Sequence, residues 1–155
     1  MPDYKLLPKV ELHLHLDSSL SFEAVYKNRP DISQNQFREL FVAPPKCKNL
    51  PDYLKRVSNQ VDLLQTEESL TVAVDTLLQQ LIADNVIYAE IRFAPLLHTQ
   101  QELNAGKVLE IVTDTIQKHS ASANEGPEVR SSSAAFGISS EAQSIEYCRT
   151  GHCIQ

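Results

Sequence analysis

Residues 10–17 read VELHLHLD, and this run alternates with a period of two. Aliphatic side chains take the even positions and ionisable side chains the odd ones: Val10, Leu12, Leu14 and Leu16 against Glu11, His13, His15 and Asp17. Successive side chains of a β-strand point to opposite faces, so the run predicts a strand with one aliphatic and one ionisable face. Ionisable groups on an otherwise buried strand need partners or a metal ion.

A second strand is predicted in residues 85–95, which read NVIYAEIRFAP. One face holds Ile87, Ala89, Ile91 and Phe93, and the other holds Tyr88, Glu90 and Arg92. Between the two strands, Ser33, Pro51 and Thr66 stand where helices should begin. A further amphipathic helix is predicted over residues 105–119. Strand, helices, strand and helix in this order indicate an α/β fold with a parallel sheet.

Composition narrows the class of function. The formal net charge is -6, and the basic residues are scattered, so there is no electrostatic footprint for nucleic acid or an anionic membrane. No run of 18 apolar residues predicts a membrane-spanning helix. Three cysteines without framework spacing favour a reducing cytoplasm. We therefore expect a protein that acts on small molecules. The sequence does not indicate the oligomeric state.

His13 and His15 form a His-x-His pair on the ionisable face. Two positions along a strand separate their backbones by about 6.5–7 Å, which lets both rings converge on one ion. Neutral imidazole suits zinc. The alternative is a pair of satisfied or exposed histidines without a metal.

Other polar residues favour simpler interpretations. Arg92 is expected to pair with Glu11 or Glu90, and Arg92→Ala would then cost on the order of 3 kcal/mol. His98 follows the second strand and is expected to be a solvated loop histidine. Cys148, His152 and Cys153 lie in a terminal stretch without a second half-site, so we expect no metal there.

Two motifs resemble one family in the correct order. LPKVELHLHLD, residues 7–17, resembles the opening motif of the adenosine deaminase family of metal-dependent amidohydrolases. NVIYAEIRFAPLLH, residues 85–98, is similar to that family's second-strand motif, and LPDYLKR lies between them as in the family. The resemblance covers residues 5–118.

The resemblance implies a partial (β/α)8 TIM barrel, with the first two or three strands and their helices. A complete barrel needs about 250 residues, whereas this chain has 155. The domain prediction is an N-terminal part of the barrel over residues 1–119 and a divergent tail over 120–155. That tail has eight serines, and EVRSSSAAFGIS is a poor third strand, so we expect a frame-shifted or disordered segment. Within it, SEAQSIE resembles the segment after the family's third strand.

The resemblance also implies roles for single residues. His13 and His15 match the first two ligands of one Zn²⁺, and Asp17 matches the residue that contacts the sugar of the substrate. Ser18 departs from the family, which usually has Gly there. No catalytic residue is assigned, because the family's further ligands and proton donor lie on later strands.

The implied function is hydrolytic deamination of adenosine, a purine nucleoside, to inosine by a zinc enzyme. We expect the chain as given to be incomplete and inactive alone. Two alternatives stay open: deamination of adenine or a modified adenine nucleotide, and a non-catalytic fragment that binds a metal or a partner.

Overall fold

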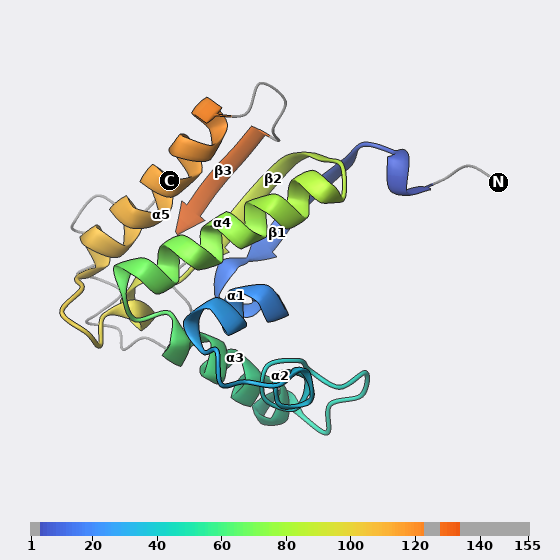
Figure 1. Ribbon diagram of the computed structural model, residues 1–155, viewed down its shortest axis with the longest axis vertical. Helices are drawn as coiled ribbons and strands as arrows, with labels where there is room; N and C mark the ends of the chain where they lie inside the picture. The colour runs from blue at the N-terminus through green and yellow to red at the C-terminus, as the bar shows by residue number, and fades with distance from the viewer. Residues whose placement is uncertain (1–3, 123–127, 134–155) are drawn as a thin grey trace.

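The computed structural model describes residues 4–122 and 128–133, which form an α/β fold around one sheet (Figure 1). The strands are β1 (Lys9–His15), β2 (Val86–Phe93) and β3 (Glu128–Ser133), in the order β1-β2-β3. Both strand pairs are parallel, which confirms the predicted sheet. The fold is a partial (β/α)8 barrel, with its first strands and their helices.

Helices make the long connections that parallel strands require. Those between β1 and β2 are α1 (Phe22–Asn28), α2 (Gln34–Leu40), α3 (Leu50–Leu63) and α4 (Glu67–Ala83), and α5 (Ala105–Ser122) follows β2. Three 3-10 turns complete the elements: η1 (Tyr4–Leu6), η2 (Leu16–Ser18) and η3 (Pro95–His98). Ser33 and Thr66 cap α2 and α4 as predicted. None of the described helices is long and apolar enough to cross a membrane.

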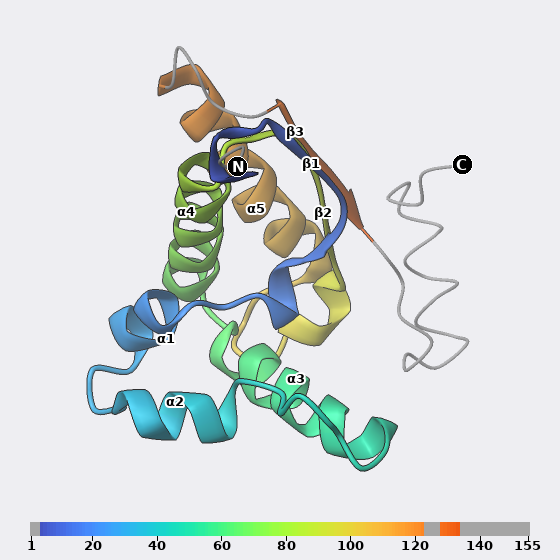
Figure 2. The same cartoon turned by 90° about the vertical axis from the view of Figure 1, so that its right-hand side faces the viewer.

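The core lies between the sheet and two helices, α4 and α5, which cover the same face of the sheet (Figure 2). Its buried side chains come from both layers and include Leu70, Val74, Leu77, Ala89, Ile91, Phe93, Val108 and Val112. Each fully buried side chain of the size of Val, Leu or Phe contributes about 1.5–3 kcal/mol. In a (β/α)8 barrel the helices lie outside the sheet, so the face that no described helix covers, called the uncovered face below, corresponds to the barrel interior.

The N-terminal half of β1 departs from the predicted alternation. Val10 and Leu12 are 51% and 59% exposed, although the sequence places them on a buried aliphatic face. Two causes are visible: β1 pairs only with β2 among the described strands, and the register shifts between Glu11 and Leu14. Leu14, beyond the shift, packs against the core as predicted.

The third strand lies where the sequence predicts only a poor one. Glu128–Ser133 form β3, paired with β2 in register from Tyr88↔Glu128 to Phe93↔Ser133. Parallel backbone hydrogen bonds do not require apolar side chains, which explains how a serine-rich segment can pair. The domain division at residue 119 stays a prediction, since residues 123–127 and 134–155 lie outside the described part of the chain.

Candidate functional site

Two imidazoles meet at the carboxyl end of β1. His13 Nε2 and His15 Nε2 lie 3.1 Å apart, and the ring centroids are 5.0 Å apart. His13 is exposed and His15 is half-buried. Active sites of (β/α)8 barrels lie at this end of the strands. The structure thus brings the two predicted ligands together, whereas their role as ligands stays a prediction.

Asp17 lies directly beyond the strand, in η2, and is buried. Its Oδ1 atom is 3.7 Å from His15 Nδ1. Its Oδ2 atom accepts a hydrogen bond of 3.3 Å from the backbone N–H of Ala94, which follows β2. A buried carboxylate needs such donors. Asp17 therefore joins the carboxyl ends of two neighbouring strands.

His98 is buried rather than solvated, so the expectation of an exposed loop histidine is wrong. Its side chain has 0% exposure, and its Nδ1 atom lies 2.9 Å from the carbonyl oxygen of Leu64. Its Nε2 atom lies 3.9 Å from Asp17 Oδ2. The sequence gives no signal for this burial, because Leu64 is 34 positions away along the chain.

A small cavity of about 190 Å³ opens beside His15 and Asp17. Its other lining side chains come from η2, α3 and η3: Ser18, Tyr53, Leu54, Val57 and Leu97. Leu54 and Val57 recur at helical spacing with Val61 and Leu64 after Pro51, a pattern typical of one apolar helix face. In the structure, Leu54 is 36% exposed and Tyr53 41% exposed. Tyr53 and Leu54 of α3 therefore border the cavity rather than the core.

Helix α3 lies beside the strand ends (Figure 2), and two buried glutamines, Gln60 and Gln65, hold it there. Gln60 accepts from the N–H of Leu20 at 3.0 Å and donates to the carbonyl of Phe41 at 3.1 Å. Gln65, just after α3, donates to the carbonyl of Leu97 at 2.9 Å and accepts from the N–H of Gln100 at 3.0 Å. These bonds tie α3 to the loops that follow β1 and β2.

The start of α3 is held by a charged network. Asn49 accepts from the N–H of Asp52, and Asp52 accepts from the N–H of Lys48 at 3.2 Å and from Arg56 at 2.8 Å. The backbone N–H of Lys48 and the Arg56 guanidinium hold the pKa of Asp52 below its usual range. The helix bordering the cavity is thus fixed at both ends.

Glu90 and Arg92 lie on the uncovered face of β2. Arg92 Nη2 is 3.7 Å from Glu90 Oε2, which confirms the predicted pairing of Arg92 with a carboxylate. Tyr88 also donates to Glu90 at 3.0 Å. This row of polar contacts supports a structural role for Glu90 and Arg92.

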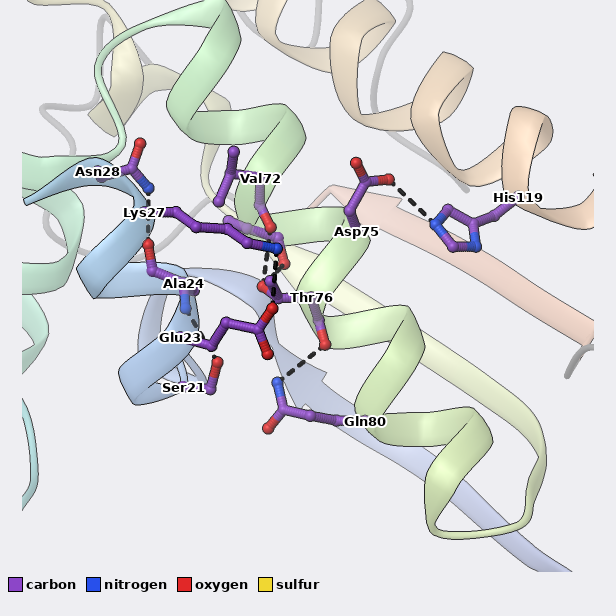
Figure 3. Close-up of polar contacts among 11 residues, drawn as sticks. Ser21, Glu23, Ala24, Lys27, Asn28, Val72, Asp75, Thr76, Gln80 and His119 are labelled. Carbon is purple, nitrogen blue, oxygen red and sulfur yellow. Dashed lines mark hydrogen bonds and ion pairs between the residues drawn. The ribbon is translucent and has the colours of Figure 1, made fainter. Parts of the chain in front are cut away.

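The remaining described histidine lies on the helical layer. Figure 3 shows His119 of α5 next to Asp75 of α4, with 3.1 Å between His119 Nε2 and Asp75 Oδ1. Across the described residues, no group of three or more His, Cys, Asp or Glu side chains is arranged to hold a metal ion. Cys148, His152 and Cys153 lie outside the described residues. The assignment of His13 and His15 as metal ligands therefore stays a prediction.

The sequence of the chain is similar to one known protein family. The family model described as "Adenosine deaminase" matches residues 8–150. An adenosine deaminase of Clostridium perfringens is 39% identical over 119 residues, which are 72% of this chain and 36% of that protein. An adenosine deaminase of Clostridium botulinum is 33% identical over 123 residues, which are 75% of this chain and 37% of that protein. The chain therefore spans little more than a third of these relatives.

Solved structures share the fold. Adenine deaminase of Arthrobacter aurescens superimposes with a TM-score of 0.75 at 23% identity, over 92% of this chain and 44% of that one. The N6-mAMP deaminase of Arabidopsis gives a TM-score of 0.74 at 16% identity, over 94% and 46%. An amidohydrolase of Burkholderia ambifaria with bound Zn gives 0.74 at 17% identity, over 98% and 43%. Together with the match of the family model over residues 8–150, these results lead to one conclusion: the chain belongs to the adenosine deaminase family.

Proposed function

We propose that this chain supplies two zinc ligands and part of the purine site of a hydrolase that converts adenosine to inosine. The observation that carries the proposal is the His13–His15 pair, with its Nε2 atoms 3.1 Å apart beside the cavity. Two nitrogens bound to a tetrahedral zinc ion at 2.0–2.1 Å stand about 3.3 Å apart. The donor pair thus fits one Zn²⁺ with little movement.

When bound, zinc supplies a Lewis acid that activates water for hydrolysis at neutral pH. His13 and His15 would hold the ion. Zinc hydrolases generally use three or more protein ligands, and these two histidines provide only part of such a set. A positioned proton donor typically contributes a factor of about 10²–10⁴, and we assign none in this chain. We therefore expect the 155-residue chain alone not to deaminate adenosine.

The cavity suits one end of a purine nucleoside. Tyr53, Leu54 and Val57 offer apolar surface to the faces of a base and exclude water from it. Asp17 borders the same cavity, and in this proposal its carboxylate accepts a hydrogen bond from a sugar hydroxyl. Ser18, at the position where Gly is usual, also lines the cavity and adds a side chain there.

Adenosine is favoured over other adenine compounds by the curated relatives at 39% and 33% identity, which are adenosine deaminases. The adenine and N6-mAMP deaminases among the solved structures keep adenine and modified nucleotides as alternative substrates. A non-catalytic fragment that binds a metal or a partner is the other alternative. We place the chain in the cytoplasm, on the odd number of its cysteines.

A chimera tests the proposed substrate. Residues 1–119 of this chain replace the matching segment of the Clostridium perfringens enzyme, which supplies the later strands. We expect the chimera to deaminate adenosine faster than adenine or N6-methyl-AMP. The rate of each reaction is measured by the change in ultraviolet absorbance. His13→Ala should abolish turnover, and His119→Ala should leave it intact.

A folded, zinc-loaded chimera without turnover would contradict the proposed function. The unfused chain, assayed with added Zn²⁺, should show no turnover. Turnover by the unfused chain that is lost in His13→Ala would contradict the expectation that this chain alone is inactive.

A further inference from the structure

A fully buried imidazole lies next to the proposed zinc site. His98 donates from Nδ1 to the carbonyl oxygen of Leu64 over 2.9 Å. Because a carbonyl oxygen only accepts, Nδ1 carries hydrogen and the orientation of the ring is set. The Nε2 atom is buried and has no hydrogen-bond partner among the described residues. A buried polar atom without a partner is unfavourable, so the acceptor nearest to it is informative.

That acceptor is Asp17, which connects His98 to His15. Asp17 Oδ2 lies 3.9 Å from His98 Nε2 and accepts from the N–H of Ala94. Asp17 Oδ1, the other oxygen, lies 3.7 Å from His15 Nδ1. A carboxylate offers about four acceptor positions, so these contacts still leave room for a substrate hydroxyl. The side chains follow one another from the Leu64 carbonyl to the two ligand nitrogens.

We propose that His98 is a positioning residue: its buried Nε2 faces Asp17 Oδ2 at 3.9 Å, directs an N–H toward that carboxylate and so fixes the ring of His15. Asp17 Oδ1 in turn faces His15 Nδ1 at 3.7 Å, so that His15 Nε2, 3.1 Å from His13 Nε2, is the ring nitrogen that would face the metal. Histidine ligands commonly donate their second ring N–H to a carboxylate, which sets the tautomer. This role rests on the proposed zinc site and deepens it.

Two substitutions separate positioning from packing. Asn at position 98 can retain a donor for the Leu64 carbonyl but loses the donor that faces Asp17, whereas Gln does the reverse. We expect His98→Asn to weaken Zn²⁺ binding by the whole 155-residue chain about 10–100-fold, since this is the usual effect of losing such a supporting contact. His98→Gln should bind Zn²⁺ more tightly than His98→Asn.

The affinity is measured by competition with a chromophoric chelator, and circular dichroism checks the fold. His119→Asn, at the His119–Asp75 pair on α4 and α5, is the matched control and should leave the affinity unchanged. Equal losses in His98→Asn and His98→Gln would indicate packing alone and overturn the proposal.

Nitrogen-15 NMR of the metal-free wild-type chain gives a test that needs neither zinc nor a variant. We expect a single tautomer of His15 with hydrogen on Nδ1. Hydrogen on Nε2 instead would overturn the positioning role, even if the chain binds zinc. The expected tautomer in a chain that does not bind Zn²⁺ would support the His98–Asp17–His15 arrangement and contradict the zinc site.

Discussion

Arg92 and Glu90 form an ion pair that remains accessible to water. Their charged atoms are 3.7 Å apart, and their side chains are 34% and 32% exposed. Pairs in such surroundings contribute about 0–1 kcal/mol, because water and salt screen them. The cost of about 3 kcal/mol inferred from the sequence assumed a guanidinium buried inside a closed barrel. That assumption does not hold here, because the Arg92 side chain is 34% exposed.

Arg92→Ala is therefore expected to lower the free energy of unfolding by about 1 kcal/mol or less. Chemical denaturation of the wild type and the variant measures the difference. Glu90→Gln, which removes the other charge, should give a similar loss. A loss near 3 kcal/mol in Arg92→Ala alone would show that the guanidinium is desolvated after all.

The site residues differ in how far sequence alone could place them. His13, His15 and Asp17 follow from a two-residue alternation within one short segment, which needs no knowledge of distant contacts. His98 does not follow, because its environment depends on Leu64 and Asp17, which lie 34 and 81 positions before it. Tertiary packing decides its burial.

Among the elements, α3 has the most direct bearing on the cavity. Its start was marked by Pro51, and its apolar spacing was visible in the sequence. The spacing could not show that Tyr53 and Leu54 border a cavity. A hydrophobic period identifies the apolar face of a helix but not the part of the protein that packs against it. That answer comes from the glutamine contacts that fix where the helix lies.

Gln65→Leu is expected to destabilise the chain by about 1–3 kcal/mol, since Gln65 is buried and its hydrogen bonds with the carbonyl of Leu97 and the N–H of Gln100 are lost. It should also increase amide hydrogen exchange in α3 and η3. Gln79→Leu, at an exposed position of α4, is the control and should change stability by less than about 0.5 kcal/mol. Equal effects of the two substitutions would contradict the anchoring role of Gln65.

The whole molecule leaves apolar surface on β1. Val10 and Leu12 are 51% and 59% exposed, and β1 pairs on one side only among the described strands. The chain spans 36–37% of the adenosine deaminases it matches, whose remaining length is available to cover such a surface. Fold class and strand order could be predicted from the sequence, whereas this exposure could not, because alternation assumes a covered face.

The exposed edge of β1 predicts that copies of the chain associate through this strand. Leu12→Lys is expected to reduce this self-association, because a charge on an edge strand disfavours pairing with another strand. Sedimentation velocity over a range of concentrations measures the change. Leu14→Lys is the contrasting variant: Leu14 packs against the core, so its replacement should destabilise the fold. If a folded Leu12→Lys chain associates as strongly as the wild type, the β1 edge is not the surface through which the chains associate.

The central claim is that His13 and His15 together bind one zinc ion. Titration of Zn²⁺ into the 155-residue chain, with stoichiometry and affinity measured for the wild type, His13→Ala, His15→Ala and His119→Ala, tests it most directly. We predict one ion per wild-type chain, affinity weakened at least about tenfold by either His13→Ala or His15→Ala, and no change in His119→Ala. Wild-type affinity in His13→Ala and His15→Ala would contradict the claim.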